Sequence, residues 1–270
     1  MIKEEIIKKL KHLTRHDFIE ITTRGNTAIE SALSILPKGK KVLIPEEGGW
    51  LTYQDLPKKL GLELEEVRCA DAKIDLQDLA KKIEKGSAFL YQNPGGYFAE
   101  QPLKDIYQVC KEKESLVLLD ASGSIGTKLC EGRFADIIIG SFGKWKLVEA
   151  HTGGFVSCND KNLFDKIKKN IVPLEDQEKL NLILKKLNEL DERIKFLTKK
   201  RKEILEDLKE FDLVHKEDLA FVVVVKFSTV EEKEKIINYC NKKELEWTEC
   251  PRYIRLNKPA ISIEVKRLLK

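Results

Sequence analysis

The chain has 270 residues, and its 49 Lys and Arg against 45 Asp and Glu give a formal net charge of +4. Both signs are spread along the whole length, so no basic stripe indicates a nucleic-acid partner. No apolar run approaches the ~18 residues that a membrane span needs, and segment 1–13 is typical of an amphipathic helix instead of a signal peptide. The six cysteines show no C-x-x-C pattern. We therefore expect a cytoplasmic protein with no zinc site and no disulfide framework.

From residue 17 to residue 158 short apolar runs alternate with helical patterns. Runs such as Ile137-Ile138-Ile139 are continuously apolar, which is typical of parallel strands buried on both faces. We predict an α/β domain over residues 1–165, with a mostly parallel sheet covered by helices. The expected strands are 17–22, 40–45, 87–92, 115–120, 135–141 and 153–158, and the expected helices between them are 27–36, 51–61 and 103–113.

Residues 166–212 have a different character. Segment 177–210 contains no Gly or Pro and carries apolar residues three and four apart. This spacing predicts one long amphipathic helix that connects two domains. In residues 213–270 alternation resumes, and we expect a small α+β domain. Its predicted elements are a strand at 219–227, a helix at 230–243, a strand near 253–257 and a short helix at 262–270.

Residues at the ends of the predicted strands are the first candidates for a site, because open parallel sheets bind ligands beyond their carboxyl ends. Segment 24–27, Arg-Gly-Asn-Thr, lies between a strand and a helix. Gly25 would let a ligand approach the backbone, Asn26 or Thr27 can cap the helix, and free N–H groups of the first turn favour an anion such as phosphate. The alternative is an ordinary helix cap.

Three further strand ends carry polar or aromatic residues. Asp120 ends a buried strand, where a carboxylate needs a cation or several donors; Ser122 follows it, and both could simply form a turn. Asn93 begins an Asn-Pro-Gly-Gly turn and is a candidate ligand. Trp50 follows a glycine pair and could stack on a planar ring, or pack into the core.

Two lysines, Lys144 and Lys146, follow Ser141 at another strand end and precede the pair Gly153-Gly154. Lysine is normally solvated, but in a closed pocket it loses its charge more easily and becomes a nucleophile for carbonyl chemistry. Composition and position alone do not choose between the two.

Taken together, the order of these segments resembles fold-type I pyridoxal-phosphate enzymes, and most closely the DegT/DnrJ/EryC1 aminotransferase family, in a short variant. That family carries its lysine in a Ser-Phe-x-x-x-Lys segment shortly before Gly-Gly. Read onto "SFGKWKLVEAHTGG", the spacing selects Lys146. The resemblance covers residues 20–160 well and the remainder in outline.

The resemblance implies pyridoxal 5'-phosphate as the cofactor and assigns roles to the candidates. Lys146 would hold the cofactor as an internal aldimine and later shuttle a proton, and Asp120 would pair with the pyridinium nitrogen. Trp50 would stack on the ring, Ser122 would lie near it and Asn93 would reach its 3'-hydroxyl. The phosphate would be bound by Gly25, Asn26, Thr27 and Ser141.

Segment 251–257, "PRYIRLN", is similar to the small-domain segment in which many fold-type I enzymes place the arginine that grips a substrate carboxylate. Arg255 suits that role because its planar guanidinium matches a carboxylate bidentately. Arg252 is the competitor, and either could be a surface charge. The resemblance implies an aminotransferase with an amino-acid donor and a keto or aldehyde acceptor, acting as a homodimer.

Two other functions stay open at this point. One is a lyase, or a sulfur- or selenium-transfer enzyme such as a cysteine desulfurase, because Cys250 precedes the arginine segment as a loop cysteine does in desulfurases. The other is an inactive fold-type I scaffold, which the short chain makes credible. Fold alone does not fix function.

Overall fold

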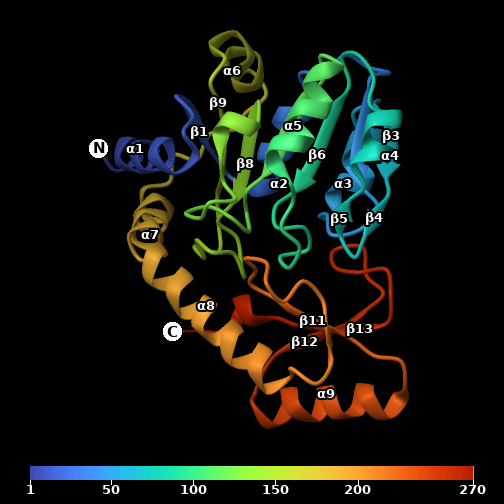
Figure 1. Ribbon diagram of the computed structural model, residues 1–270. Helices are drawn as coiled ribbons and strands as arrows, with labels where there is room; N and C mark the ends of the chain where they lie inside the picture. The colour runs from blue at the N-terminus through green and yellow to red at the C-terminus, as the bar shows by residue number, and fades with distance from the viewer. Residues whose placement is uncertain (270) are drawn as a thin grey trace.

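The computed structural model describes residues 1–269 and consists of a large mixed sheet with helices on both faces and a smaller sheet below it (Figure 1). The large sheet has seven strands in the order β1-β9-β8-β7-β6-β2-β3. Strands β2, β3, β6, β7 and β8 are parallel neighbours, and β9 runs antiparallel to β8 and β1. The predicted mostly parallel sheet is thus confirmed. The strands are β1 (Phe18–Thr22), β2 (Lys41–Pro45), β3 (Glu63–Val67), β6 (Ala88–Gln92), β7 (Leu116–Asp120), β8 (Ile137–Ser141) and β9 (Gly154–Cys158).

The helices cover this sheet from both sides, because alternate residues of its strands point to opposite faces. The hydrophobic core on one face contains side chains of α2, α3 and α6, and the core on the other face contains side chains of α1, α4, α5 and α7. A two-stranded hairpin, β4 (Cys69–Ala70) and β5 (Lys73–Ile74), precedes α4. The helices are α1 (Ile2–Thr14), α2 (Gly25–Leu33), α3 (Thr52–Lys59), α4 (Leu76–Lys82), α5 (Leu103–Glu112) and α6 (Lys161–Lys168).

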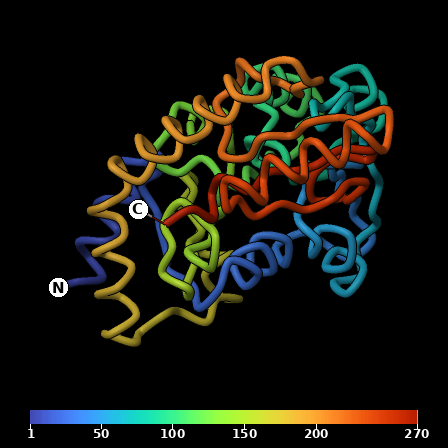
Figure 2. The backbone as a smooth tube through the Cα atoms, turned by 90° about the horizontal axis from the view of Figure 1, so that it is seen from below, coloured from blue at the N-terminus to red at the C-terminus, as the bar shows by residue number. Residues whose placement is uncertain are grey.

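The segment predicted as one long helix is two helices, α7 (Gln177–Asn188) and α8 (Leu190–Asp207), which meet at Glu189. Helix α7 lies beside α1 at one end of the large sheet, and α8 continues to the small sheet (Figures 1 and 2). Helix α7 packs against α1, whereas α8 contacts β11 (Val223–Lys226) and η2 (Val265–Arg267) of the C-terminal region. The division into 1–165, 166–212 and 213–270 stays a proposal, with its first boundary falling inside α6.

The small sheet has the antiparallel order β10-β11-β13-β12. Its strands are β10 (Asp212–Leu213), β11 (Val223–Lys226), β12 (Trp247–Cys250) and β13 (Ala260–Ile263), and α9 (Val230–Lys242) covers the face away from the large sheet (Figure 1). The predicted strand near 253–257 is wrong: this segment is the loop between β12 and β13, flanked by Pro251 and Pro259, which cannot donate to a strand ladder.

The predicted C-terminal helix at 262–270 is also corrected, because Ser262 and Ile263 belong to β13 and a short 3-10 turn, η2 (Val265–Arg267), follows within the described residues. Residue 270 of that prediction lies outside the described residues. The other face of the small sheet packs on loops of the large domain through Val222, Val224 and Ala260. Within residues 1–269, no helix is both long enough and apolar enough to cross a membrane.

Candidate active site

A cavity of about 370 Å³ lies at the carboxyl ends of the parallel strands. The topology explains its place, because β7 ends at Asp120 and its neighbour β8 ends at Ser141, beside Gly154 of β9. Seven of the residues predicted from the sequence line this one cavity: Gly25, Asn26, Trp50, Asp120, Ser122, Ser141 and Lys146.

One end of the cavity carries the features that the sequence predicts for binding an anion. Helix α2 begins there at Gly25, and no side chain among residues 1–269 caps its first turn. A Cβ atom on Gly25 would lie 2.6 Å from Cβ of Ser141, and one on Gly154 would lie 2.8 Å from N of Gly25, so only glycines allow these segments to meet. Arg24, which the sequence analysis did not assign, adds a positive charge to the lining. Helix N-termini and arginine both favour phosphate.

The carboxylate of Asp120 lies in the same cavity and is held by two donors. The Tyr53 hydroxyl donates to its Oδ2 at 2.7 Å, and the backbone N–H of Ser122 donates to its Oδ1 at 2.9 Å. Burial, with a further contribution from the Asp120 charge, raises the pKa of Tyr53 well above its usual range, so Tyr53 remains a hydrogen-bond donor. Ser122 Oγ in turn accepts from the backbone N–H of Ser141 at 2.9 Å, which ties β8 to the same site.

The two lysines have different surroundings. Lys146 lines the cavity, with its Nζ 4.5 Å from the ring centroid of Trp50. Trp50 Nε1 donates to Asn26 Oδ1 at 3.1 Å, so the indole contacts both Lys146 and the 24–27 loop, which is the predicted anion-binding loop. Lys144 is exposed, with its Nζ 4.4 Å from the Trp145 ring, and does not line this cavity. The structure therefore brings Lys146, and not Lys144, together with Asp120.

Three predicted residues, Thr27, Asn93 and Arg255, are not among those that line the cavity. Thr27 Oγ1 lies 3.4 Å from Thr23 Oγ1. Asn93 is fully buried, and its Oδ1 accepts from the backbone N–H of Gln101 at 3.0 Å, which stabilises its own turn. Contact of Thr27 or Asn93 with a ligand stays a prediction.

Arg255 is only 3% exposed, and its guanidinium is engaged inside the small domain. Its Nη2 donates to both carboxylate oxygens of Glu264, its Nε to Ser262 and Glu264, and its Nη1 to the carbonyl of Ile254. The geometry does not present Arg255 to the cavity, and its predicted contact with a substrate carboxylate is not supported by these partners. Arg252, the competitor, is exposed.

Sequence reasoning missed several residues of the site. Arg24 and His151 line the cavity, Tyr53 holds Asp120, and Tyr97 contacts Lys146. Tyr53 could have been suspected because it stands in the same strand-end segment as Trp50, and a buried tyrosine hydroxyl usually has a hydrogen-bond partner. Tyr97 follows a glycine-rich turn, and no sequence pattern around it indicates a contact with Lys146.

A large mixed sheet of this strand order, flanked by helices on both faces, is the architecture of the fold-type I pyridoxal-phosphate proteins. The family model for aminotransferase class I and II matches residues 2–264, and the chain belongs to this family. Membership implies pyridoxal phosphate as the cofactor. A comparison with curated proteins gives no match.

Solved structures share the fold at low identity. Serine palmitoyltransferase from S. paucimobilis is 17% identical with a TM-score of 0.75, over 97% of this chain and 71% of that one. Aspartate aminotransferase of subgroup IV from Thermus thermophilus is 15% identical with a TM-score of 0.74, over 98% and 85%. 3-Amino-5-hydroxybenzoic acid synthase is 14% identical with a TM-score of 0.75, over 97% and 85%.

The residues of the cavity fit the implied cofactor. A substituted pyridine with a phosphate arm needs an anion-binding end, a carboxylate for its ring nitrogen, an aromatic face and an amine. The cavity supplies the loop at Gly25 with Arg24, the carboxylate of Asp120, the indole of Trp50 and the amine of Lys146.

Proposed function

We propose that this protein is a pyridoxal-phosphate-dependent aminotransferase that moves an amino group from an amino acid to a keto or aldehyde acceptor. The observation that carries the proposal is that Lys146 and Asp120 line one cavity, together with Trp50 and the anion-binding loop. When bound, the cofactor supplies a ring that takes up the electron pair released at the substrate α-carbon. The remaining work falls to side chains of the chain itself.

Binding and orientation come first. Gly25, Asn26 and Ser141 are proposed to hold the phosphate, with Arg24 adding charge. Trp50 would cover the ring, since its indole is already fixed by Asn26. Asp120 would accept a hydrogen bond from the ring nitrogen and favour its protonated form.

Lys146 has two successive tasks in this proposal. Its Nζ would hold the cofactor covalently. Its amine, when not bonded to the cofactor, would act as the base that takes up the proton of the substrate α-carbon and gives it back. Its position beside Trp50, in the same cavity as Asp120, suits a group that must reach both the cofactor and the substrate.

Within the superfamily we place the chain near the DegT/DnrJ/EryC1 aminotransferases. The five-residue step from Ser141 to Lys146, followed by Gly153-Gly154, supports this placement. The proposal includes a homodimer, which the resemblance implies. A cytoplasmic location and the lack of a nucleic-acid partner are part of it on the grounds of cysteine usage and of the evenly spread charge.

Desulfurase chemistry is the less favoured alternative. Cys250 ends β12 in register with Ala260, is 2% exposed and is not among the cavity residues. Burial raises the pKa of its thiol, which disfavours the thiolate that sulfur transfer requires. The buried position of Cys250, outside the cavity, therefore gives no support to sulfur transfer.

The proposal is tested by a half-reaction. The protein is loaded with pyridoxal phosphate, freed of excess cofactor and mixed with each of the common amino acids, and the 2-oxo acid and pyridoxamine phosphate are quantified. We expect stoichiometric formation of both from at least one amino acid. Release of sulfide and alanine from cysteine, lost in Cys250→Ser, would indicate the desulfurase. Failure to bind pyridoxal phosphate would indicate the scaffold.

A further inference from the structure

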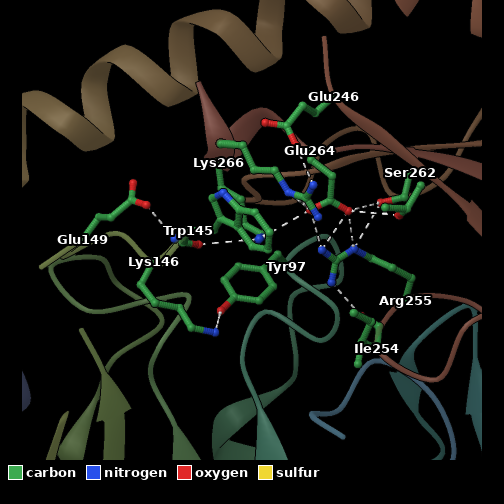
Figure 3. Close-up of polar contacts among 12 residues, drawn as sticks. Tyr97, Trp145, Lys146, Glu149, Glu246, Ile254, Arg255, Ser262, Glu264 and Lys266 are labelled. Carbon is green, nitrogen blue, oxygen red and sulfur yellow. Dashed lines mark hydrogen bonds and ion pairs between the residues drawn. The ribbon is translucent and has the colours of Figure 1, made fainter. Parts of the chain in front are cut away.

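Tyr97 touches the amine of Lys146 from outside the predicted set of site residues. Lys146 Nζ donates to the Tyr97 hydroxyl at 2.7 Å, and Tyr97 is only 3% exposed. In Figure 3 the phenol ring lies between Lys146 on one side and Lys266 and Arg255 on the other. A lysine side chain has four flexible bonds, so a single well-placed acceptor restricts its amine to one orientation.

The backbone of Tyr97 is held in an unfavourable conformation. Its φ is +68°, in the left-handed region that bulky residues rarely adopt. Hydrogen bonds fix it there: its N–H donates to the Pro94 carbonyl at 3.0 Å, and its own carbonyl accepts from the N–H of Phe221 at 2.9 Å. Strain of this kind persists where the surroundings determine it and is common at functional sites.

The ring of Tyr97 is confined from two directions. Behind it, a Cβ atom on Gly123 would lie 2.9 Å from two of its ring carbons, so glycine is needed there. From the small domain, Lys266 Nζ lies 4.8 Å and Arg255 Cζ lies 5.5 Å from its centroid. Cations favour the face of an aromatic ring.

Glu264 keeps these two cations in place. Its carboxylate is fully buried, pairs with Arg255 at 2.6 Å and lies 3.4 Å from Lys266 Nζ. A continuous set of contacts therefore runs from Glu264 through the cations to the Tyr97 ring, and from its hydroxyl to Lys146 (Figure 3).

From these contacts we infer that Tyr97 is a positioning residue. The Tyr97 hydroxyl holds the Lys146 amine, and the cluster of Glu264, Arg255 and Lys266 holds the Tyr97 ring. The inference rests on the proposed function, because it concerns the atom that attaches the cofactor. In the attachment, Lys146 Nζ forms a bond to the aldehyde carbon of pyridoxal phosphate. The aldehyde oxygen leaves as water with the two protons that the neutral amine carried.

The test compares Tyr97→Phe with Tyr91→Phe, both starting from the cofactor-free protein. Tyr91 is a matched control, because it is fully buried and its hydroxyl has no partner among residues 1–269. The rate of covalent attachment is followed by stopped-flow absorbance after pyridoxal phosphate is added, and trapping with borohydride counts the label on Lys146. Affinity for pyridoxamine phosphate, which has no aldehyde, is measured by calorimetry.

We expect Tyr97→Phe to slow attachment at least tenfold while changing the Kd for pyridoxamine phosphate less than twofold, and Tyr91→Phe to change neither. Gly123→Ala, which displaces the ring but keeps the hydroxyl, should slow attachment in the same direction. An unchanged rate in Tyr97→Phe, or an equal loss of pyridoxamine phosphate affinity, would overturn the inference. Absence of attachment in the wild type would instead overturn the proposed function.

Discussion

Lys146 and Lys266 both lie beside Tyr97, yet their surroundings differ. Lys146 lines a cavity, and its charge faces open space, the Tyr97 hydroxyl and the Trp50 ring. Lys266 is 5% exposed and belongs to a closed cluster in which Arg255, Lys266 and Arg267 surround Glu264. The first region opens onto a cavity, as a ligand site needs, whereas the second pairs its charges inside the protein.

The cavity beside Lys146 is thus open to a ligand, whereas the cluster around Glu264 packs against Tyr97 from inside the protein. Arg255 belongs to a sequence pattern typical of substrate binding, but its donors are directed to Glu264, Ser262 and a backbone carbonyl. Its role in this structure is to support Tyr97. A buried charge marks a ligand site only when its partner is missing from the protein.

The largest effect on stability should come from removing the Glu264 carboxylate from the closed cluster. Glu264→Ala leaves Arg255 and Lys266 buried without their carboxylate, so we expect a loss of about 3–5 kcal/mol in the free energy of unfolding. The control is Glu246→Ala, whose carboxylate pairs with Arg267 but is 59% exposed. It should cost no more than about 1 kcal/mol. Urea unfolding of both variants checks this, and equal losses would remove the distinction between the regions.

In the cavity that contains Asp120, Tyr53→Phe should lower the free energy of unfolding by a smaller amount than Glu264→Ala. It removes the hydroxyl that donates to Asp120 at 2.7 Å and leaves a buried carboxylate with one donor, so we expect a loss of about 1.5–3 kcal/mol. Tyr253→Phe is the matched control, because the buried Tyr253 hydroxyl has no partner in the described part of the chain. Comparable unfolding free energies for the two variants would show that Asp120 does not depend on Tyr53.

The closed cluster also predicts a pH dependence. Burial lowers the pKa of Lys266 to about 7, against the opposing effect of Glu264, from an ordinary value of 10.5. Between these values the unfolded chain binds a proton that the folded protein does not, so folding stability rises with pH. The free energy of unfolding of the wild type, measured relative to that of Lys266→Met, should rise by up to about 1.4 kcal/mol per pH unit from pH 7 to pH 9. Denaturant unfolding at three pH values measures this slope, and a constant or falling difference would contradict it.

The smallest expected effect concerns the anion end of the cavity. Arg24→Ala should weaken binding of pyridoxamine phosphate about tenfold, corresponding to about 1.4 kcal/mol, since a charge-assisted contact to phosphate is lost. Binding of pyridoxamine without its phosphate should not change. Calorimetry with both compounds separates a phosphate contact from a general effect on the cavity, which would weaken both ligands alike.

Much of the site could be predicted because parallel strands bring their carboxyl ends to one edge. Asp120, Ser141 and Lys146 each follow such a strand, and all three line the cavity. Arg255 could not be placed in this way, because its pairing with Glu264 depends on how the loop after β12 folds back on β13. The position of Tyr97 depends on a left-handed backbone, and the break between α7 and α8 falls at Glu189, inside a segment without Gly or Pro. None of these has a local sequence pattern.

Lys146 is the proposed cofactor lysine, and covalent labelling tests this role most directly. Wild type, Lys146→Ala and Lys144→Ala are each incubated with pyridoxal phosphate and treated with borohydride, and the labelled peptides are identified by mass spectrometry. Lys144 is the matched control, two residues away and outside the cavity. We predict stoichiometric label on Lys146 in the wild type and in Lys144→Ala, and none at this site in Lys146→Ala. Label on Lys144, or equal label in all three proteins, would contradict the account.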